Sequence, residues 1–326
     1  MGDNQREFVA RRERLALRAH LGGSQPSVDV DLGNFVAVRV GDVLWVSATP
    51  LTVGETRTSA LAAVLAWHVR GADRTAINII DAHTPGLTAR RASYFTTPVT
   101  VFDARMAGSN VAIPRAHDPE VATSPDHLAF ASMFREAGAD VVIEHGVVTA
   151  EVAGLEVARV IDENGVATMR IGVGAHDREM FKMLNGETAT SDQLRGVVRT
   201  VMQHRREGAP THPLNLLAPE RALRAQVLGN PEVIGARILR AAQPPVPRDN
   251  VKDSVPCCAV GEDEHGPIVA VFVAGVDLDA VPFAADARDY LVPNARLIIV
   301  TSPRNIVPVQ TRIASMLTQP AEFVSA

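Results

Sequence analysis

The densest group of side chains suited to chemistry lies between residues 144 and 179. Carboxylates act as general acids or bases when their surroundings shift the pKa, and histidine titrates close to neutral pH. Both types occur here within a short stretch of chain, so we predict an acid/base site. Its predicted catalytic residues are His176, Asp177, Glu144, Glu151 and Glu156.

Histidine is also a common metal ligand, and this stretch contains two, His145 and His176. They are the candidate ligands if a metal is bound. The sequence leaves the identity of any metal or other cofactor unknown.

A glycine loop, "GVGAHDRE" at residues 172–179, follows an expected strand and opens an expected helix. Such a loop frees backbone N–H groups to meet an anion. The predicted anion- or ligand-binding residues are Gly172, Gly174, Arg159, Arg178 and His212. A second interpretation stays open, in which the glycines only permit close packing, Asp177 caps the helix and His212 begins another helix.

The expected strand over residues 147–162 carries Glu151 and Glu156 at positions of opposite parity. A regular strand would place them on opposite faces. Gly154 lies between them, and we expect a bulge there that resets the parity. Asp279, just after another apolar strand, is expected to cap the helix that it begins.

The elements that position these residues follow from a repeat at the two ends of the chain. Residues 74–104 align without a gap to residues 296–326, and eight of the 31 pairs are identical, where chance gives about two. Each end predicts a hairpin, a helix, a strand, a second helix and a last strand, in that order. The apolar strands lack alternation, which indicates sheets covered on both faces.

We therefore predict an α/β fold with two copies of a β-β-α-β-α-β unit in a pseudo-twofold sheet assembly, interrupted by a central α+β insertion. The predicted segments are an N-terminal helix (1–22), the first repeat (23–104), the insertion (105–250) and the second repeat (251–326). In the insertion we expect a helix over 126–139, strands over 140–145, 147–162 and 166–174, and helices over 191–208 and 215–229.

Composition limits the classes of function. The net charge of −5 argues against a protein that coats nucleic acid. No apolar run approaches the roughly 20 residues that span a bilayer, so we expect no membrane partner and a cytoplasmic location. Cys257 and Cys258 are adjacent, which indicates two buried thiols rather than a disulfide. Homo-oligomerisation and the identity of any partner are left open.

Three hypotheses of function follow. The first is an enzyme of hydrolase or phosphotransfer type with a site in the insertion, which requires its carboxylates and His176 to converge in one pocket. The second is a non-catalytic ligand- or protein-binding scaffold, which predicts an exposed apolar face on the central helices. The third and weakest is nucleic-acid binding through an N-terminal basic helix with Arg6, Arg11, Arg12, Arg14 and Arg18, helped by "HRR" at 204–206.

Overall fold

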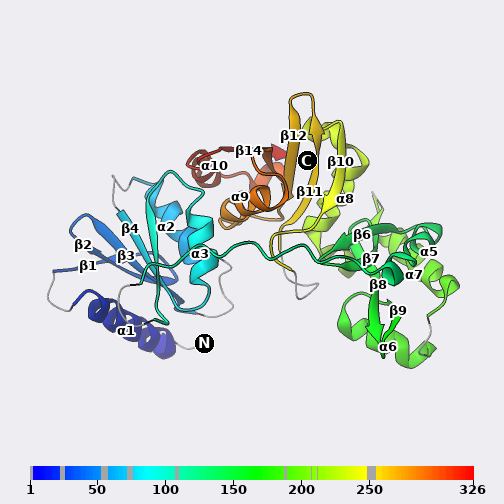
Figure 1. Ribbon diagram of the computed structural model, residues 1–326, viewed down its shortest axis with the longest axis horizontal. Coiled ribbons are helices and arrows are strands. Elements are labelled where there is room, and N and C mark those ends of the chain that lie inside the picture. Colours follow the sequence, from blue (N-terminus) through cyan, green and yellow to red (C-terminus); the bar gives the residue numbers. More distant parts are fainter. Residues whose placement is uncertain are drawn as a thin grey trace. The chain divides into compact units, whose positions relative to one another are not determined.

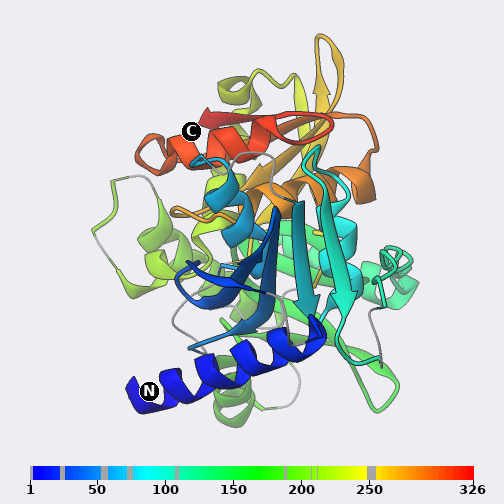
Figure 2. The same cartoon turned by 90° about the vertical axis from the view of Figure 1, so that its left-hand side faces the viewer.

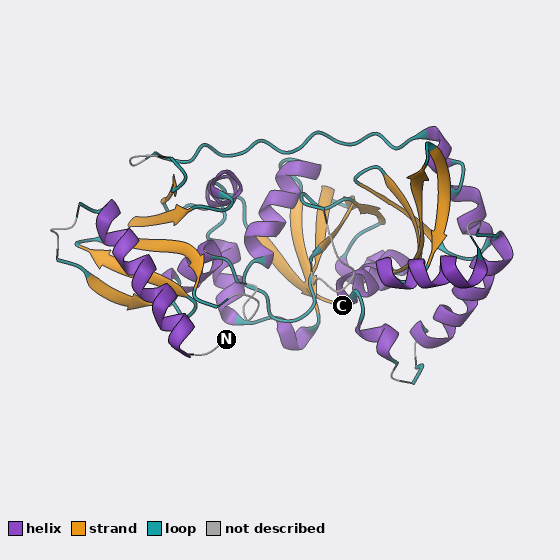
Figure 3. Ribbon diagram, turned by 90° about the horizontal axis from the view of Figure 1, so that it is seen from below, coloured by secondary structure: helices purple, strands orange, loops and turns teal. Residues whose placement is uncertain are grey.

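The structure is a computed structural model that describes residues 3–22, 26–52, 58–71, 76–106, 110–186, 189–206, 208–210, 212–247 and 255–326. These residues form ten α-helices, three short 3-10 helices and three sheets, which is a mixed α/β fold (Figures 1 and 3). The predicted boundary at residues 250 and 251 lies outside the described part of the chain. Two compact units are formed, one from Met1–His117, Val276–Asp289 and Ile306–Phe323, the other from Asp118–Gly275, Tyr290–Asn305 and Val324–Ala326.

The first unit contains a five-stranded sheet in the order β1-β2-β3-β4-β5. Its strands are β1 (Val28–Asp31), β2 (Phe35–Val40), β3 (Val43–Pro50), β4 (Ala76–Asp81) and β5 (Val99–Asp103). The first two pairs are antiparallel and the next two are parallel. The predicted hairpin and both parallel strands are present. The edge strand β1 was not predicted, because its "VDVD" is short, largely exposed and lacks an apolar run.

Helix α1 (Asp3–His20) packs against β2 and β3. Figure 2 shows it crossing the sheet at the end where the arrowheads of β4 and β5 lie. Its buried stripe consists of Ala10, Glu13 and Leu17, so helical spacing places one carboxylate among apolar side chains. Four further helices belong wholly or mostly to this unit: α2 (Ala60–His68), α3 (Pro85–Ala92), α9 (Ala280–Leu291) and α10 (Pro308–Ser315).

A second five-stranded sheet has the order β10-β11-β12-β13-β14. Its strands are β10 (Ile238–Ala242), β11 (Cys257–Asp263), β12 (Gly266–Phe272), β13 (Arg296–Thr301) and β14 (Ala321–Ser325). The β10–β11 and β11–β12 pairs are antiparallel, and β12–β13 is parallel. Helix α8 (Pro219–Gly229) packs against β10, β11 and β12. Cys257 and Cys258 are free and buried, as expected.

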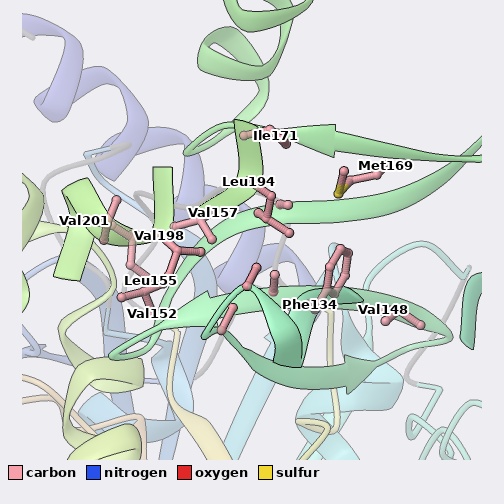
Figure 4. Packing of buried hydrophobic residues seen from close by; sticks show 14 of the residues in the cluster. Phe134, Val148, Val152, Leu155, Val157, Met169, Ile171, Leu194, Val198 and Val201 are labelled. Atoms are coloured by element: carbon pink, nitrogen blue, oxygen red, sulfur yellow. The ribbon is translucent and has the colours of Figure 1, made fainter. Parts of the chain in front are cut away.

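The third sheet is an antiparallel meander in the second unit, with strands β6 (Asp140–Glu144), β7 (Val147–Val152), β8 (Leu155–Glu163) and β9 (Val166–Ile171). Its apolar face packs against α5 (Ala131–Glu136) and α7 (Ser191–Arg205). Figure 4 shows Phe134 of α5 and Leu194 of α7 in this core. The opposite face carries polar side chains that are also buried, among them Thr149, Glu151 and Arg170, so this face is covered as well.

Two expected elements of the insertion are wrong in detail. Residues 147–162 form two strands rather than one, because Ala153 and Gly154 adopt positive φ angles of 44° and 77° and turn the chain. Gly154 is therefore a turn residue and not a bulge. The expected helix over 126–139 is divided into α4 (Pro125–Leu128) and α5.

Helix α6 (Ala175–Asn185) follows β9, and the 3-10 helices are η1 (Pro213–Leu216), η2 (Pro231–Ile234) and η3 (Pro303–Asn305). Across the described residues, no helix combines the length and the apolar character needed to cross a membrane.

Candidate functional site

The polar face of the meander carries the predicted carboxylates Glu151 and Glu156. These two residues lie directly opposite each other in the β7–β8 pair, and directly opposed residues share a face. Glu151 and Glu156 therefore lie on the same face, as expected, but a turn at Ala153 and Gly154 causes this and not a bulge. A register shift between Ala150 and Glu151 accompanies the turn.

Two arginines of α8 hold the carboxylates of Glu144 and Glu151. The Nη1 atom of Arg224 lies 2.7 Å from Oε1 of Glu144, and its Nη2 atom lies 3.3 Å from Oε2 of Glu151. Arg221 pairs with the same two carboxylates. The side chains of Arg224 and Glu151 are only 1% and 3% exposed. We call these four residues the Arg–Glu cluster.

The charges of the Arg–Glu cluster balance, with two guanidinium groups against two carboxylates. Burial acts to raise the pKa of Glu144, but Arg224 and Arg221 outweigh it, and the pKa is lowered. Arg224 also donates to the carbonyl of Cys258 at 3.3 Å. Because each carboxylate is held by both arginines, the cluster is suited to fastening α8 to the β6–β7 hairpin rather than to accepting a proton from a substrate.

Gly154 allows the β7–β8 turn to approach α8 closely. A Cβ atom on Gly154 would lie 2.2 Å from the carbonyl carbon of Arg221 and 2.6 Å from the nitrogen of Ala222. Arg205 also fastens this turn, since its Nη2 atom donates to the carbonyl of Ala153 at 2.9 Å. The glycine therefore has a packing role that the sequence alone did not reveal.

Glu156 has arginine partners of its own. Its carboxylate accepts from Nε and Nη2 of Arg159 at 2.6 and 2.8 Å, and from Nη1 of Arg178 at 3.0 Å. Two residues predicted to bind an anion thus bind a carboxylate of the protein itself.

The glycine loop packs closely and reaches back to its helix. A Cβ atom on Gly172 would lie 2.6 Å from the backbone nitrogen of Arg178, at a φ of 141°. Gly174 precedes α6 with a φ of 86°, and Oδ2 of Asp177 accepts the N–H of Val173 at 2.7 Å. These contacts favour the packing and capping interpretation over an anion site.

The three predicted histidines lie on separate elements. His176 is exposed in the first turn of α6 and makes no hydrogen bond or ion pair with a described residue. His145 forms the β6–β7 turn, and its N–H donates to Oε1 of Gln243 at 2.9 Å. The Nδ1 atom of His212 accepts the N–H of Leu214 at 3.3 Å, as expected for a helix-entry residue. Within the described ranges, no group of three or more His, Cys, Asp or Glu side chains is placed to hold a metal ion.

Asp279 does not cap its own helix as expected. Its carboxylate accepts the backbone N–H of Ser59 at 2.6 Å and also the Ser59 hydroxyl, so it supports the N-terminus of α2. Burial raises the pKa of Asp279 to about 6.

The first unit contains a cavity of about 450 Å³ that was not predicted from the sequence, between α1 and the carboxyl ends of β3, β4 and β5. In α/β sheets, ligands bind at the carboxyl ends of the strands. Seven of its lining side chains are apolar, and four are polar. The lining residues are Glu13, Ala16, Leu17, Ala19, His20, Ser47, Thr49, Ile80, Ala82, Ala104 and Met106.

The polar wall of this cavity is built from buried groups. The Ser47 hydroxyl donates to Oε2 of Glu13 at 2.7 Å, and both residues are buried. Arg12 donates to Oε1 of Glu13 at 2.8 Å, but its own side chain is 59% exposed. The Nε2 atom of His20 is buried without a hydrogen-bond partner among the described residues. One signal in the sequence points to Glu13, namely its place in the apolar stripe of α1.

A second cavity, of about 540 Å³, lies against the first half of α1 and the β1–β2 region. Its polar wall is largely solvent-facing: Arg14 pairs with Asp29 at 3.1 Å, and both side chains are about half exposed. The cavity that contains Glu13 therefore has the more enclosed polar groups.

In comparisons with known proteins, no family model, no curated protein and no solved structure matches this chain.

Proposed function

We propose that this chain is a small-molecule-binding α/β protein whose ligand occupies the cavity between α1 and the carboxyl ends of β3, β4 and β5. The observation that carries the proposal is the convergence of Glu13, His20 and Ser47 on one cavity of about 450 Å³. Binding pockets for small molecules are typically apolar, with a few placed polar groups and volumes of about 300–1,000 Å³.

The contacts around this cavity favour binding over covalent catalysis. A serine nucleophile needs a base that can take its proton, which is most often a histidine. Here the Ser47 hydroxyl donates directly to the Glu13 carboxylate instead. A carboxylate that accepts from a hydroxyl is a suitable partner for a donor group on a ligand.

We further propose that the chain is internally duplicated and that the cavity lies in the first of the two copies. Both five-stranded sheets begin with two antiparallel pairs and continue with a parallel pair. In the first unit, Thr96 N–H donates to the Met316 carbonyl and Thr318 N–H to the Tyr94 carbonyl, both at 2.8 Å. The alignment of residues 74–104 with 296–326 superposes these same positions. Such reciprocal contacts are typical of a twofold axis.

The proposed copies include one helix more than the sequence repeat. Helix α1 packs against β2 and β3, and α8 packs against β11 and β12, which stand at the equivalent places in their sheets. The second copy would then begin near Pro219 rather than at residue 251.

A cavity-filling variant tests the binding proposal. In a thermal-shift screen of small compounds, ligands should stabilise the wild-type protein. The Ala16→Phe variant, which fills the cavity, should lose this stabilisation, whereas Leu15→Phe on the exposed side of α1 should keep it. If no compound stabilises the wild type, or if stabilisation survives Ala16→Phe, the proposal is wrong.

A second candidate, protein binding, is favoured by a stripe on α6. Met180, Met183 and Leu184 are exposed at helical spacing, and Met183 is 78% exposed. This is the type of surface that the scaffold hypothesis predicts for a central helix.

The hydrolase or phosphotransfer hypothesis and the nucleic-acid hypothesis stay predictions. Elemental analysis beside His176→Ala tests the metal version of the first. Loss of binding with rising salt tests the second.

A further inference from the structure

We infer that the ligand of the α1 cavity is a small organic cation, an ammonium group on a compact apolar body. This inference rests on the proposed function, because it names the class of molecule that the same cavity would take.

The charge of the cavity wall carries the first step. Among the described residues that line the cavity, Glu13 is the only one with a side chain of a type that ordinarily carries a charge at neutral pH. Oε2 of Glu13 accepts from the Ser47 hydroxyl, and Oε1 accepts from both Nε and Nη2 of the exposed Arg12, at 3.0 and 2.8 Å. A carboxylate has about four lone-pair sites, so it can accept a further N–H from a ligand. An ammonium group supplies three such donors together with the opposite charge.

The direction of α1 provides an independent second step. The α1 residues that line the cavity all lie in the last part of this 18-residue helix; they are Glu13, Ala16, Leu17, Ala19 and His20. A helix carries a partial negative charge at its C-terminus, and this favours a cation nearby. Arg18, in the last turn, is exposed and does not line the cavity. The helix end and Glu13 therefore favour the same sign of charge.

The other lining residues indicate which non-ionic part of the ligand the cavity would accept. Leu17, Ile80 and Met106, with four alanines, line the cavity and match an apolar group. The His20 ring stands 5.6 Å from the rings of both Trp45 and Phe102, which fixes its position.

Three probes of nearly equal shape test the charge requirement: cyclohexylmethylamine, cyclohexylmethanol and cyclohexanecarboxylate. Their dissociation constants would be measured on the full chain by titration, followed by the fluorescence of Trp45 and Trp67 and by ligand-observed NMR. We expect the amine to bind about tenfold or more tightly than the alcohol, and the carboxylate to bind weakest. In Glu13→Gln, which keeps an acceptor for Ser47, the advantage of the amine over the alcohol should disappear.

Glu7→Gln is the matched control, because Glu7 lies on the same helix and lines the other cavity. It should leave all three constants unchanged. If the alcohol or the carboxylate equals the amine, or if Glu13→Gln leaves the amine advantage intact, the inference is wrong while the proposed function stands. If Glu7→Gln abolishes the amine advantage, the cation site lies in the other cavity and the inference is wrong. If no probe binds and no compound stabilises the wild type in the thermal-shift screen, the proposed function itself fails.

Discussion

Helices α1 and α8 each pack on the antiparallel part of a five-stranded sheet, and each places a charged residue in its buried stripe. In α8 two charged residues, Glu220 and Arg224, are buried, and Arg224 is held by two glutamates of the meander. In α1 the buried charged residue is Glu13, which has a serine and an exposed arginine as partners and faces a cavity. A buried charge whose counter-ions are also buried is structural, whereas a buried charge beside a cavity, with an exposed arginine as its counter-ion, can also bind a ligand.

Breaking the Arg–Glu cluster should have the largest effect. Arg224→Met leaves two buried carboxylates with one guanidinium group, and removing one partner of a buried ion pair typically costs about 3–5 kcal/mol. Urea denaturation should show a loss of this size in the free energy of unfolding.

The exposed pair of Arg195 and Asp192 provides the control for this experiment. Arg195→Met should cost less than about 1 kcal/mol, as is usual for exposed ion pairs. Equal losses in the two variants would mean that the Arg–Glu cluster does not stabilise the fold as described.

Replacing Gly154 tests the close approach of α8 to the meander. Gly154→Ala and Gly165→Ala introduce the same methyl group at similar φ angles of 77° and 80°, but only Gly154 has backbone atoms in its way. The difference between their free energies of unfolding should be about 1–3 kcal/mol, the usual cost of overpacking. A difference near zero would show that the turn and the helix can move apart freely.

Acid should weaken the ion pairs of Glu144 by a smaller amount. The folded pKa of Glu144 is lowered by Arg224 and Arg221, against the effect of burial. Its stabilisation is therefore complete above the unfolded pKa of about 4.3 and is lost as the pH falls below that value. Urea denaturation between pH 7 and pH 3 should show a flatter pH dependence in Glu144→Gln than in the wild type. An equal slope in both would contradict this assignment, and the exposed Glu136→Gln should keep the wild-type slope.

The smallest effect on stability is expected at Glu13. Glu13→Gln keeps the hydrogen bond with Ser47 and leaves no buried charge behind, so it should change the free energy of unfolding by less than about 1 kcal/mol. A loss as large as that of Arg224→Met would show that Glu13 is structural, and the contrast between α1 and α8 would fail.

Local patterns in the sequence predicted most of the strands and helices. The hairpin of β2 and β3, the parallel strands and α7 follow from apolar runs and glycine turns. The strands β1 and β10 were missed because they are sheet edges with little buried surface: β1 is polar and largely exposed, and Ala242 is the one buried residue of β10. The turn at Ala153 and Gly154 was missed because Ala153 is not a usual residue for a positive φ angle.

The site was harder to predict because its contacts join distant parts of the chain. Glu144 and Glu151 lie close together in the structure as they do in the sequence, but the arginines that hold them lie about 70–80 residues further along. Glu13 was part of a helix that was interpreted through its arginines. Its partner Ser47, 34 residues away, is an ordinary strand residue until α1 is placed on the sheet.

Mapping a ligand by NMR tests the account most directly. Backbone amide shifts of the wild-type protein would be recorded as cyclohexylmethylamine is added. We predict that the changes gather at residues 13–20 of α1 and at Ser47 and Thr49, while α8 and the meander stay unchanged. Changes centred on Glu144, Glu151 and α8, with none near Glu13, would contradict the account.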